Sequence, residues 1–225
     1  ISQSRLLEEK CILYSIPYRL VGGVNFYQRK EIKDILCYLK TIANGQDDLA
    51  VQRIINVPKR GIGATSVGKV TIFASANGMS FYDALLRVRG ITTLGKAADK
   101  IGVFTEQIED FKARLPKMSI KELIEEVLEN TGYKKEIEAE GEIESETRLQ
   151  NIEELINKAV SYSENEENPT LDGFLEEVAL VADVDNMDES ENRIVLMTLH
   201  SAKGLEFPYV YLSGLEDGLF PSSMS

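Results

Sequence analysis

Apolar residues recur at helical spacing through most of the chain. In the segment after residue 29, four of them fall on one helical face: Ile32, Ile35, Leu36 and Leu39. The same spacing, interrupted by breakers such as Pro58, Gly78 and Pro116, predicts eight helices. Their ranges are Arg29–Ile42, Leu49–Val57, Ser66–Ala76, Phe81–Val88, Lys96–Leu115, Ile120–Thr131, Ile143–Ser161 and Leu171–Ala182.

Three serine and glutamate positions sharpen these boundaries. Ser80 and Ser119 each precede a predicted helix and are expected to accept a hydrogen bond from its first turn. Glu122, three residues after Ser119, completes the pattern of a capping box.

Short apolar runs near the two ends of the chain predict β-strands at Tyr18–Val21, Ile194–Leu199 and Tyr209–Leu212. We expect the two ends to pair in one parallel sheet, because parallel strands are joined by long crossover connections. The helices between them then form an insertion. The predicted fold class is mainly α, with boundaries near Phe26 and Ser190. The polar stretch 183–192, DVDNMDESEN, predicts a mobile connection.

Charge is distributed unevenly along the chain. The net charge of −12 argues at first against a nucleic-acid partner. Residues 1–119, however, carry 18 Lys and Arg against 11 Asp and Glu, a net charge of +7. Residues 120–191 carry 5 against 23, a net charge of −18. The first segment can follow phosphates, whereas the second is repelled by them and is expected to face solvent or a protein.

Composition excludes several classes of protein. No apolar run approaches the roughly 18 residues that span a bilayer, and the N-terminus lacks the pattern of a signal peptide. Cys11 and Cys37 lie in helical patterns without CxxC spacing, and the chain has a single histidine. We therefore predict no metal site, and two buried free thiols in a reducing compartment.

Residues 196–208, LMTLHSAKGLEFP, hold the densest candidate chemistry. An apolar strand ends in Thr198 and His200, and a Lys203–Gly204 turn and Glu206 follow. Polar groups beyond the carboxyl ends of strands are where open α/β sheets bind ligands. From the chemistry alone, a core strand with an ordinary Lys-Gly turn is an equal alternative.

A second candidate is the glycine-rich, basic stretch VPKRGIGATS. Gly61 and Gly63 allow the backbone to approach a phosphate closely, with amides turned outward. The predicted helix start at Thr65 and Ser66 adds unsatisfied N–H groups. Lys59, Arg60 and Lys69 supply counter-charge. The alternative is a purely structural turn.

Five blocks together resemble the superfamily 1 DNA helicases of the UvrD/PcrA/Rep type. Residues 196–208 resemble their motif V, and residues 56–63, NVPKRGIG, resemble their duplex-contacting loop. The remaining blocks are PYRLVGGVNFYQRKEIKDILCYL at 17–39, TRLQNIEEL at 147–155 and GLEDGLFPSSMS at 214–225. Their order and spacing hold over essentially the whole chain.

The resemblance implies a role for each site. Glu206 would hold the ATP ribose with Lys203 and Gly204 at the same site, where Lys203 pairs either with a phosphate or with an acid of another domain. Thr198 and His200 would contact single-stranded DNA. The duplex-binding set would be Lys59, Arg60, Gly61, Ile62, Gly63, Thr65, Ser66 and Lys69. For Arg148 we expect an ion pair within the helical part rather than a DNA contact.

The resemblance also implies an architecture. Residues 1–25 and 190–225 would be fragments of a RecA-like α/β motor domain (2A), and residues 26–189 its inserted all-helical subdomain (2B). No G-x-x-x-x-G-K-[ST] loop is present, so we expect the chain to be one piece of a larger motor and to be catalytically inactive by itself.

The parent is expected to be a bacterial cytoplasmic 3′–5′ helicase that uses ATP and Mg²⁺. Its partners would be duplex and single-stranded DNA, the other motor domains, and repair or transcription proteins, with no membrane. Two alternatives remain: a protein-interaction module that docks such partners through its acidic helices, and a subunit of a related recombination helicase-nuclease.

Overall fold

The computed structural model describes residues 4–21, 26–186 and 193–213. The chain divides into two compact units, residues 1–26 with 179–225 (unit 1) and residues 27–178 (unit 2). Helices dominate the described residues, and one two-stranded sheet accompanies them. The predicted mainly α fold is confirmed.

Unit 1 contains the sheet. Strand β1 (Tyr18–Val21) pairs in parallel with β2 (Ile194–Met197), with Tyr18 opposite Ile194 and Val21 opposite Met197. The amide of Ile194 also donates to the carbonyl of Pro17 at 2.9 Å. The predicted parallel pairing of the two chain ends is thus confirmed, and the connection between the strands contains all of unit 2. Helix α1 (Ser4–Leu13) precedes β1, and α11 (Leu199–Ala202) follows β2.

Two predictions in this unit were wrong. Tyr209–Leu212 is not a strand: Tyr209 is 85% exposed, Tyr211 is 92% exposed, and no described strand lies beside them. A strand needs a hydrogen-bonded neighbour, which an apolar run alone does not supply. The predicted connection at 183–192 is helical over its first part, because α10 (Leu171–Asn186) continues through it. Residues 187–192 of that prediction lie outside the described residues.

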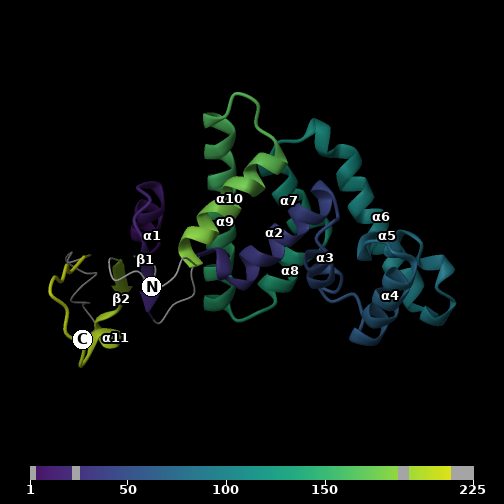
Figure 1. Cartoon of the computed structure of the whole chain (residues 1–225), viewed down its shortest axis with the longest axis horizontal. Coiled ribbons are helices and arrows are strands. Elements are labelled where there is room, and N and C mark those ends of the chain that lie inside the picture. The colour runs from purple at the N-terminus through teal and green to yellow at the C-terminus, as the bar shows by residue number, and fades with distance from the viewer. Residues whose placement is uncertain (1–3, 22–25, 187–192, 214–225) are drawn as a thin grey trace. The chain divides into compact units, whose positions relative to one another are not determined.

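Unit 2 is built around α2 (Lys30–Ala43), which packs against α3 (Asp48–Ile54), α6 (Ala97–Arg114), α7 (Ile120–Asn130) and α9 (Glu142–Asn165) (Figure 1). The predicted apolar face of α2 is buried as expected. The other helices are α4 (Ala64–Asn77), α5 (Phe81–Leu86) and α8 (Tyr133–Glu138), together with the part of α10 up to Val178. Short 3₁₀ turns complete the unit: η1 (Phe26–Gln28), η2 (Val88–Gly90), η3 (Thr92–Leu94) and η4 (Leu115–Lys117).

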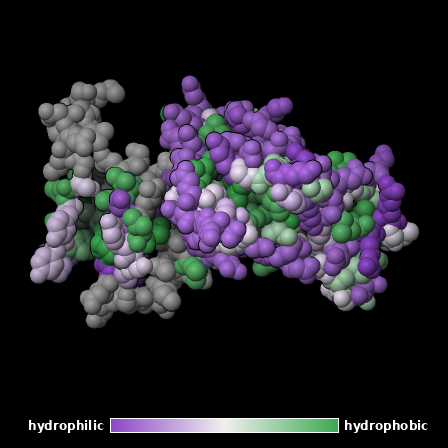
Figure 2. Space-filling model, turned by 90° about the horizontal axis from the view of Figure 1, so that it is seen from above, coloured by the Kyte–Doolittle hydropathy of each residue, from purple (hydrophilic) through white to green (hydrophobic). Residues whose placement is uncertain are grey.

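The eight predicted helices are present, with ends that differ by at most about four residues, as is usual for boundaries read from sequence. Both predicted caps are confirmed. Ser80 accepts from the amide of Asp83, and Ser119 forms a reciprocal capping box with Glu122. The short helix α8 was not predicted. Hydrophilic residues cover most of the visible face of unit 2, with hydrophobic patches between them (Figure 2).

Candidate nucleic-acid interface

Residues 56–63, which we call the GIG loop, connect α3 to α4 and are held by side chains. The Oδ1 atom of Asn56 accepts hydrogen bonds from the amides of Arg60 at 2.9 Å and Ile62 at 3.1 Å. The amide of Lys59 donates to Oε2 of Glu136, on α8, at 2.9 Å. With the amide of Val57, which donates to the carbonyl of Ile54 at 3.0 Å, four amides of the loop are already satisfied, so only part of its amides can turn outward. The loop is fixed before any ligand arrives.

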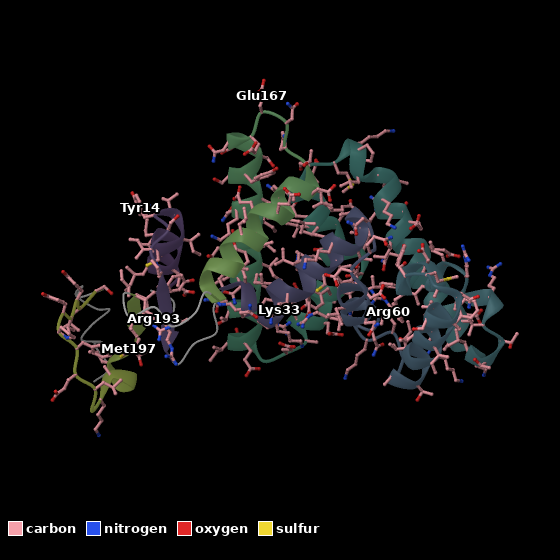
Figure 3. The ribbon with its side chains drawn as sticks, in the orientation of Figure 1. Tyr14, Lys33, Arg60, Glu167, Arg193 and Met197 are labelled. Atoms are coloured by element: carbon pink, nitrogen blue, oxygen red, sulfur yellow. The ribbon has the colours of Figure 1, made fainter. Side chains whose placement is uncertain are left out.

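Arg60 differs from its predicted role as a surface counter-charge. Its guanidinium lies beneath the loop, where it donates to the carbonyls of Ile54 at 3.1 Å and Pro58 at 3.2 Å (labelled in Figure 3). It also donates to the hydroxyl of Tyr38 at 2.6 Å and lies 5.2 Å from the centre of the Phe104 ring. A fork of five donors suits such a cluster of acceptors. Arg60 thus supports the loop from below.

The Tyr38 hydroxyl also helps to hold the loop in place. Burial raises its pKa, so it stays protonated and donates to the carbonyl of Val57 at 2.6 Å. Ile62 likewise anchors the loop: its side chain is only 1% exposed, and its amide is bound to Asn56. Ile62 therefore holds the loop in the core, whereas the sequence suggested that it faces the ligand.

The two glycines of the loop are not equivalent. Gly61 has a φ of +72°, a conformation that favours glycine. A Cβ there would lie 2.5 Å from Nζ of Lys100. Gly63 has an ordinary extended backbone, φ −85° and ψ 168°, and a Cβ there would meet no atom within 4 Å. Only Gly61 is required by the fold of the loop.

The start of α4 leaves open donors at the surface. Gly63 is its N-cap and provides no side chain to bind the first amides, while its carbonyl accepts from Ser66 and Val67. No described hydrogen bond uses the amides of Gly61, Gly63, Ala64 or Thr65. Thr65 is exposed and Ser66 half-buried. Lys59 is exposed and Lys69 half-buried, and neither forms an ion pair with a described carboxylate. This surface can accept an anion.

The predicted ATP and single-strand residues lie in unit 1, after β2. Thr198 is exposed and lies just before α11. Because α11 extends to Ala202, the turn expected at 201–204 is helical in its first half. Lys203 and Gly204 form a turn in which Gly204 has a φ of +83°. Glu206 is exposed and pairs with no described residue. The backbone of His200 lies in α11, and its side chain is outside the described part.

Arg148 forms ion pairs within unit 2, as predicted. Its Nε lies 3.4 Å from Glu31, and its Nη1 pairs with Glu140. Neither Cys11 nor Cys37 forms a disulfide bond, and burial raises the pKa of Cys37, which disfavours the reactive thiolate. Within the described segments, no three His, Cys, Asp or Glu side chains gather as metal ligands. None of the described helices is long and apolar enough to span a membrane.

Three residues that position the loop were missed from sequence. Asn56 lies directly before the basic residues of the loop. An Asn before a turn often bonds to the backbone of that turn, and this was the one local signal in the sequence that could have indicated its role. Glu136 and Lys100 approach the loop from 77 and 39 residues away, so no local pattern could indicate them.

Comparison with known proteins gives one consistent family. A model of the UvrD-like helicase C-terminal domain matches residues 2–225. The chain is 45% identical to the ATP-dependent DNA helicase PcrA of Bacillus subtilis over 230 residues, which covers 100% of the chain and 31% of that protein. It is 46% identical to the PcrA proteins of Staphylococcus epidermidis and Staphylococcus aureus, over 98% of the chain and 30% of each relative.

The chain thus spans about a third of the length of these relatives. The family match and the identities extend over the GIG loop, the helical unit and the segment after β2 alike. The chain therefore belongs to the family of UvrD-like helicase C-terminal domains.

Proposed function

We propose that this chain is part of a bacterial, cytoplasmic ATP-dependent 3′–5′ DNA helicase, in which the GIG loop and the start of α4 grip the backbone of duplex DNA. The observation that carries the proposal is the preformed loop beside the open amides of Gly63, Ala64 and Thr65, where the ammonium groups of Lys59 and Lys69 form no ion pair with a described carboxylate. Such a surface binds phosphates without reading bases. The names of the PcrA relatives support the helicase assignment.

The proposal also assigns a division of labour between the two parts of the chain. Residues 26–189 form the inserted helical subdomain (2B), and residues 1–25 and 190–225 are parts of motor domain 2A. The separation of unit 2 from the paired strands of unit 1 supports this division. In the parent helicase, Thr198 and His200 face single-stranded DNA. Mg-ATP supplies the energy of unwinding, and Glu206 with Lys203 and Gly204 belongs to its binding site.

The proposal predicts how duplex binding depends on salt. Replacing both Lys59 and Lys69 with glutamine in the full-length helicase removes two phosphate contacts. The slope of log K against log salt is then expected to flatten by about 1.8 units, because each contact contributes about 0.9. Fluorescence anisotropy with blunt duplexes of unrelated sequence measures this slope, which is expected to be the same for each sequence.

A matched control is Lys117→Gln, another exposed lysine without a described acidic partner. It is expected to leave the slope unchanged. If the Lys59 and Lys69 double variant also retained the wild-type slope and affinity, the loop would be only a turn. The rival assignment, a module that docks repair or transcription proteins through its acidic helices, would then take its place.

Glu206 is tested separately. Its carboxylate is exposed and pairs with no described side chain, so it can accept hydrogen bonds from the vicinal hydroxyls of a ribose. Glu206→Gln in the full-length helicase is expected to weaken ATP binding roughly tenfold or more, since a hydrogen bond to a charged group contributes on the order of 1.5–3 kcal/mol. Equilibrium titration with a fluorescent ATP analogue measures the change. Duplex affinity without nucleotide serves as the control and is expected to stay constant; unchanged ATP affinity would contradict the role.

A further inference from the structure

The first turn of α6 lies against the GIG loop, although the two are far apart in sequence. Nζ of Lys100 donates to the carbonyl of Gly61 at 3.3 Å. The same ammonium would be 2.5 Å from a Cβ on Gly61. A positive charge therefore sits at the one loop residue whose φ excludes ordinary side chains. A neutral carbonyl takes only one of its three N–H donors, so the others remain for a ligand.

The segment that leads into α6 is tied to the same surface. Lys69, on α4, donates to the carbonyl of Thr93 in η3, and η3 packs on α4. From η3 the chain passes through Gly95 to Lys96, the N-cap residue of α6. Thr93, Lys96 and Lys100 are all exposed. The GIG loop, the start of α4, η3 and the first turn of α6 thus form one connected surface.

This surface carries an excess of positive charge. Elsewhere in unit 2 many basic side chains are paired, as Arg53 is with Asp34 and Lys134 with Glu129. At this surface no described carboxylate lies within ion-pair distance of the four lysines Lys59, Lys69, Lys96 and Lys100. Two carboxylates are close in the fold: Asp99, next to Lys100 on α6, and Glu136, which binds the amide of Lys59. The four lysines therefore outnumber these two carboxylates by two.

We propose that Lys96 and Lys100 form a second line of phosphate contacts, which extends the duplex-binding surface from the GIG loop across the first turn of α6. The proposal rests on the proposed function of the loop and assigns its ligand class, the sugar-phosphate backbone of a duplex, to two further residues. Lys100 keeps its bond to the Gly61 carbonyl and donates its remaining N–H groups to a phosphate. Lys96, which takes part in no described side-chain hydrogen bond, meets a neighbouring phosphate.

The test measures the salt dependence of duplex binding by the full-length helicase. Lys96→Gln and Lys100→Gln are each expected to flatten the slope of log K against log salt by about 0.9, and the pair by about 1.8. Near physiological salt this corresponds to roughly fivefold weaker binding per lysine. Lys100→Arg retains the charge and is expected to retain the slope. Binding to single-stranded DNA is expected to stay unchanged.

Lys117→Gln is the matched control, in the 3₁₀ turn η4 that follows α6. Lys117 is exposed and lies just beyond the far end of α6, about 25 Å from Lys100 at 1.5 Å per residue. If the Lys96 and Lys100 variants keep the wild-type slope while the Lys59 and Lys69 pair flattens it, this inference is wrong and the function of the loop stands. If neither pair changes the slope, the proposed function itself fails.

One complication is the contact between Lys100 and the loop, because Lys100→Gln could loosen Gly61. Lys96 has no such contact, so a flatter salt slope for Lys96→Gln can be attributed to a lost phosphate contact. Thermal unfolding by circular dichroism shows whether Lys100→Gln remains as stable as the wild type. A change of slope confined to a destabilised Lys100→Gln, with Lys96→Gln unchanged, contradicts the second line of contacts.

Discussion

Replacing Asp34 with alanine is expected to lower the free energy of unfolding of the helical unit by about 2–3 kcal/mol, because it removes hydrogen bonds to a buried charged group, which contribute about 1.5–3 kcal/mol each. Asp34 lies on α2 and its side chain is only 1% exposed. It accepts hydrogen bonds from Nε of Arg53 at 2.7 Å and from the hydroxyl of Tyr133 at 2.6 Å. Alanine leaves the buried hydroxyl of Tyr133 without this acceptor, whereas the guanidinium of Arg53, which is 35% exposed, can turn to water.

The loss spreads because Tyr133 belongs to a larger network. Its hydroxyl also accepts from Nη2 of Arg148 at 3.0 Å, and Arg148 pairs with Glu31 and Glu140. Burial raises the pKa of Tyr133, and the neighbouring Asp34 carboxylate raises it further, so the hydroxyl remains a donor. The network joins α2, α3, α8 and α9 in one arrangement. It also fixes α8, the helix that carries Glu136 to the GIG loop.

Urea unfolding of the chain, followed by far-UV circular dichroism, measures the effect as a lower midpoint with an unchanged slope. Asp110→Ala is the matched control, since Asp110 is 62% exposed and pairs with Arg114 on the surface of α6. An exposed pair of this spacing contributes about 0.3–0.5 kcal/mol. A loss for Asp34→Ala as small as that of the control would show that the network adds little to stability.

Local patterns predicted the helices well, and the reason is visible in α2 and α7. The buried face of α2 repeats at helical spacing, and the capping box of Ser119 and Glu122 involves residues three apart. Such signals are complete within one segment of sequence. The strand predicted at Tyr209–Leu212 had no such support, because a strand forms only beside a partner.

The charged residues show the limit of sequence reasoning more clearly. Asp34 and Glu31 are buried, although acidic residues on a helix are usually exposed. The Asp34 partner Tyr133 is 99 residues away, and the Glu31 partner Asn151 is 120 residues away. Arg60 was predicted to supply counter-charge to a phosphate, but whether its side chain turns outward or inward depends on acceptors that only the folded chain brings together.

Gly63→Val in the full-length helicase is expected to weaken duplex binding tenfold or more without loss of stability. The backbone of Gly63 is extended, a conformation that valine adopts readily, and its Cβ would meet no neighbouring atom within 4 Å. The added side chain would instead project into the space above the open amides of Gly63, Ala64 and Thr65. A phosphate that approaches these amides is displaced, and each charge-assisted hydrogen bond lost costs about 1.5–3 kcal/mol.

Gly141→Val is the matched control for this substitution. Gly141 is the N-cap of α9, with φ −60° and ψ 146° and no side-chain cap, so its backbone role equals that of Gly63. Its neighbours are acidic, and a Cβ would make only an ordinary contact with Glu144 at 3.7 Å. We expect wild-type duplex affinity for this variant.

Gly61→Val is less informative than Gly63→Val, because a φ of +72° and the nearby Lys100 add strain to any lost contact. Duplex titration, thermal unfolding and ATP hydrolysis stimulated by single-stranded DNA, measured on the same preparations, separate these effects. Gly63→Val is expected to weaken duplex binding alone and to leave thermal stability and ATP hydrolysis unchanged. A folded Gly63→Val variant that binds duplex as tightly as the wild type would show that phosphates do not reach the start of α4, and the lysines alone would then carry the contact.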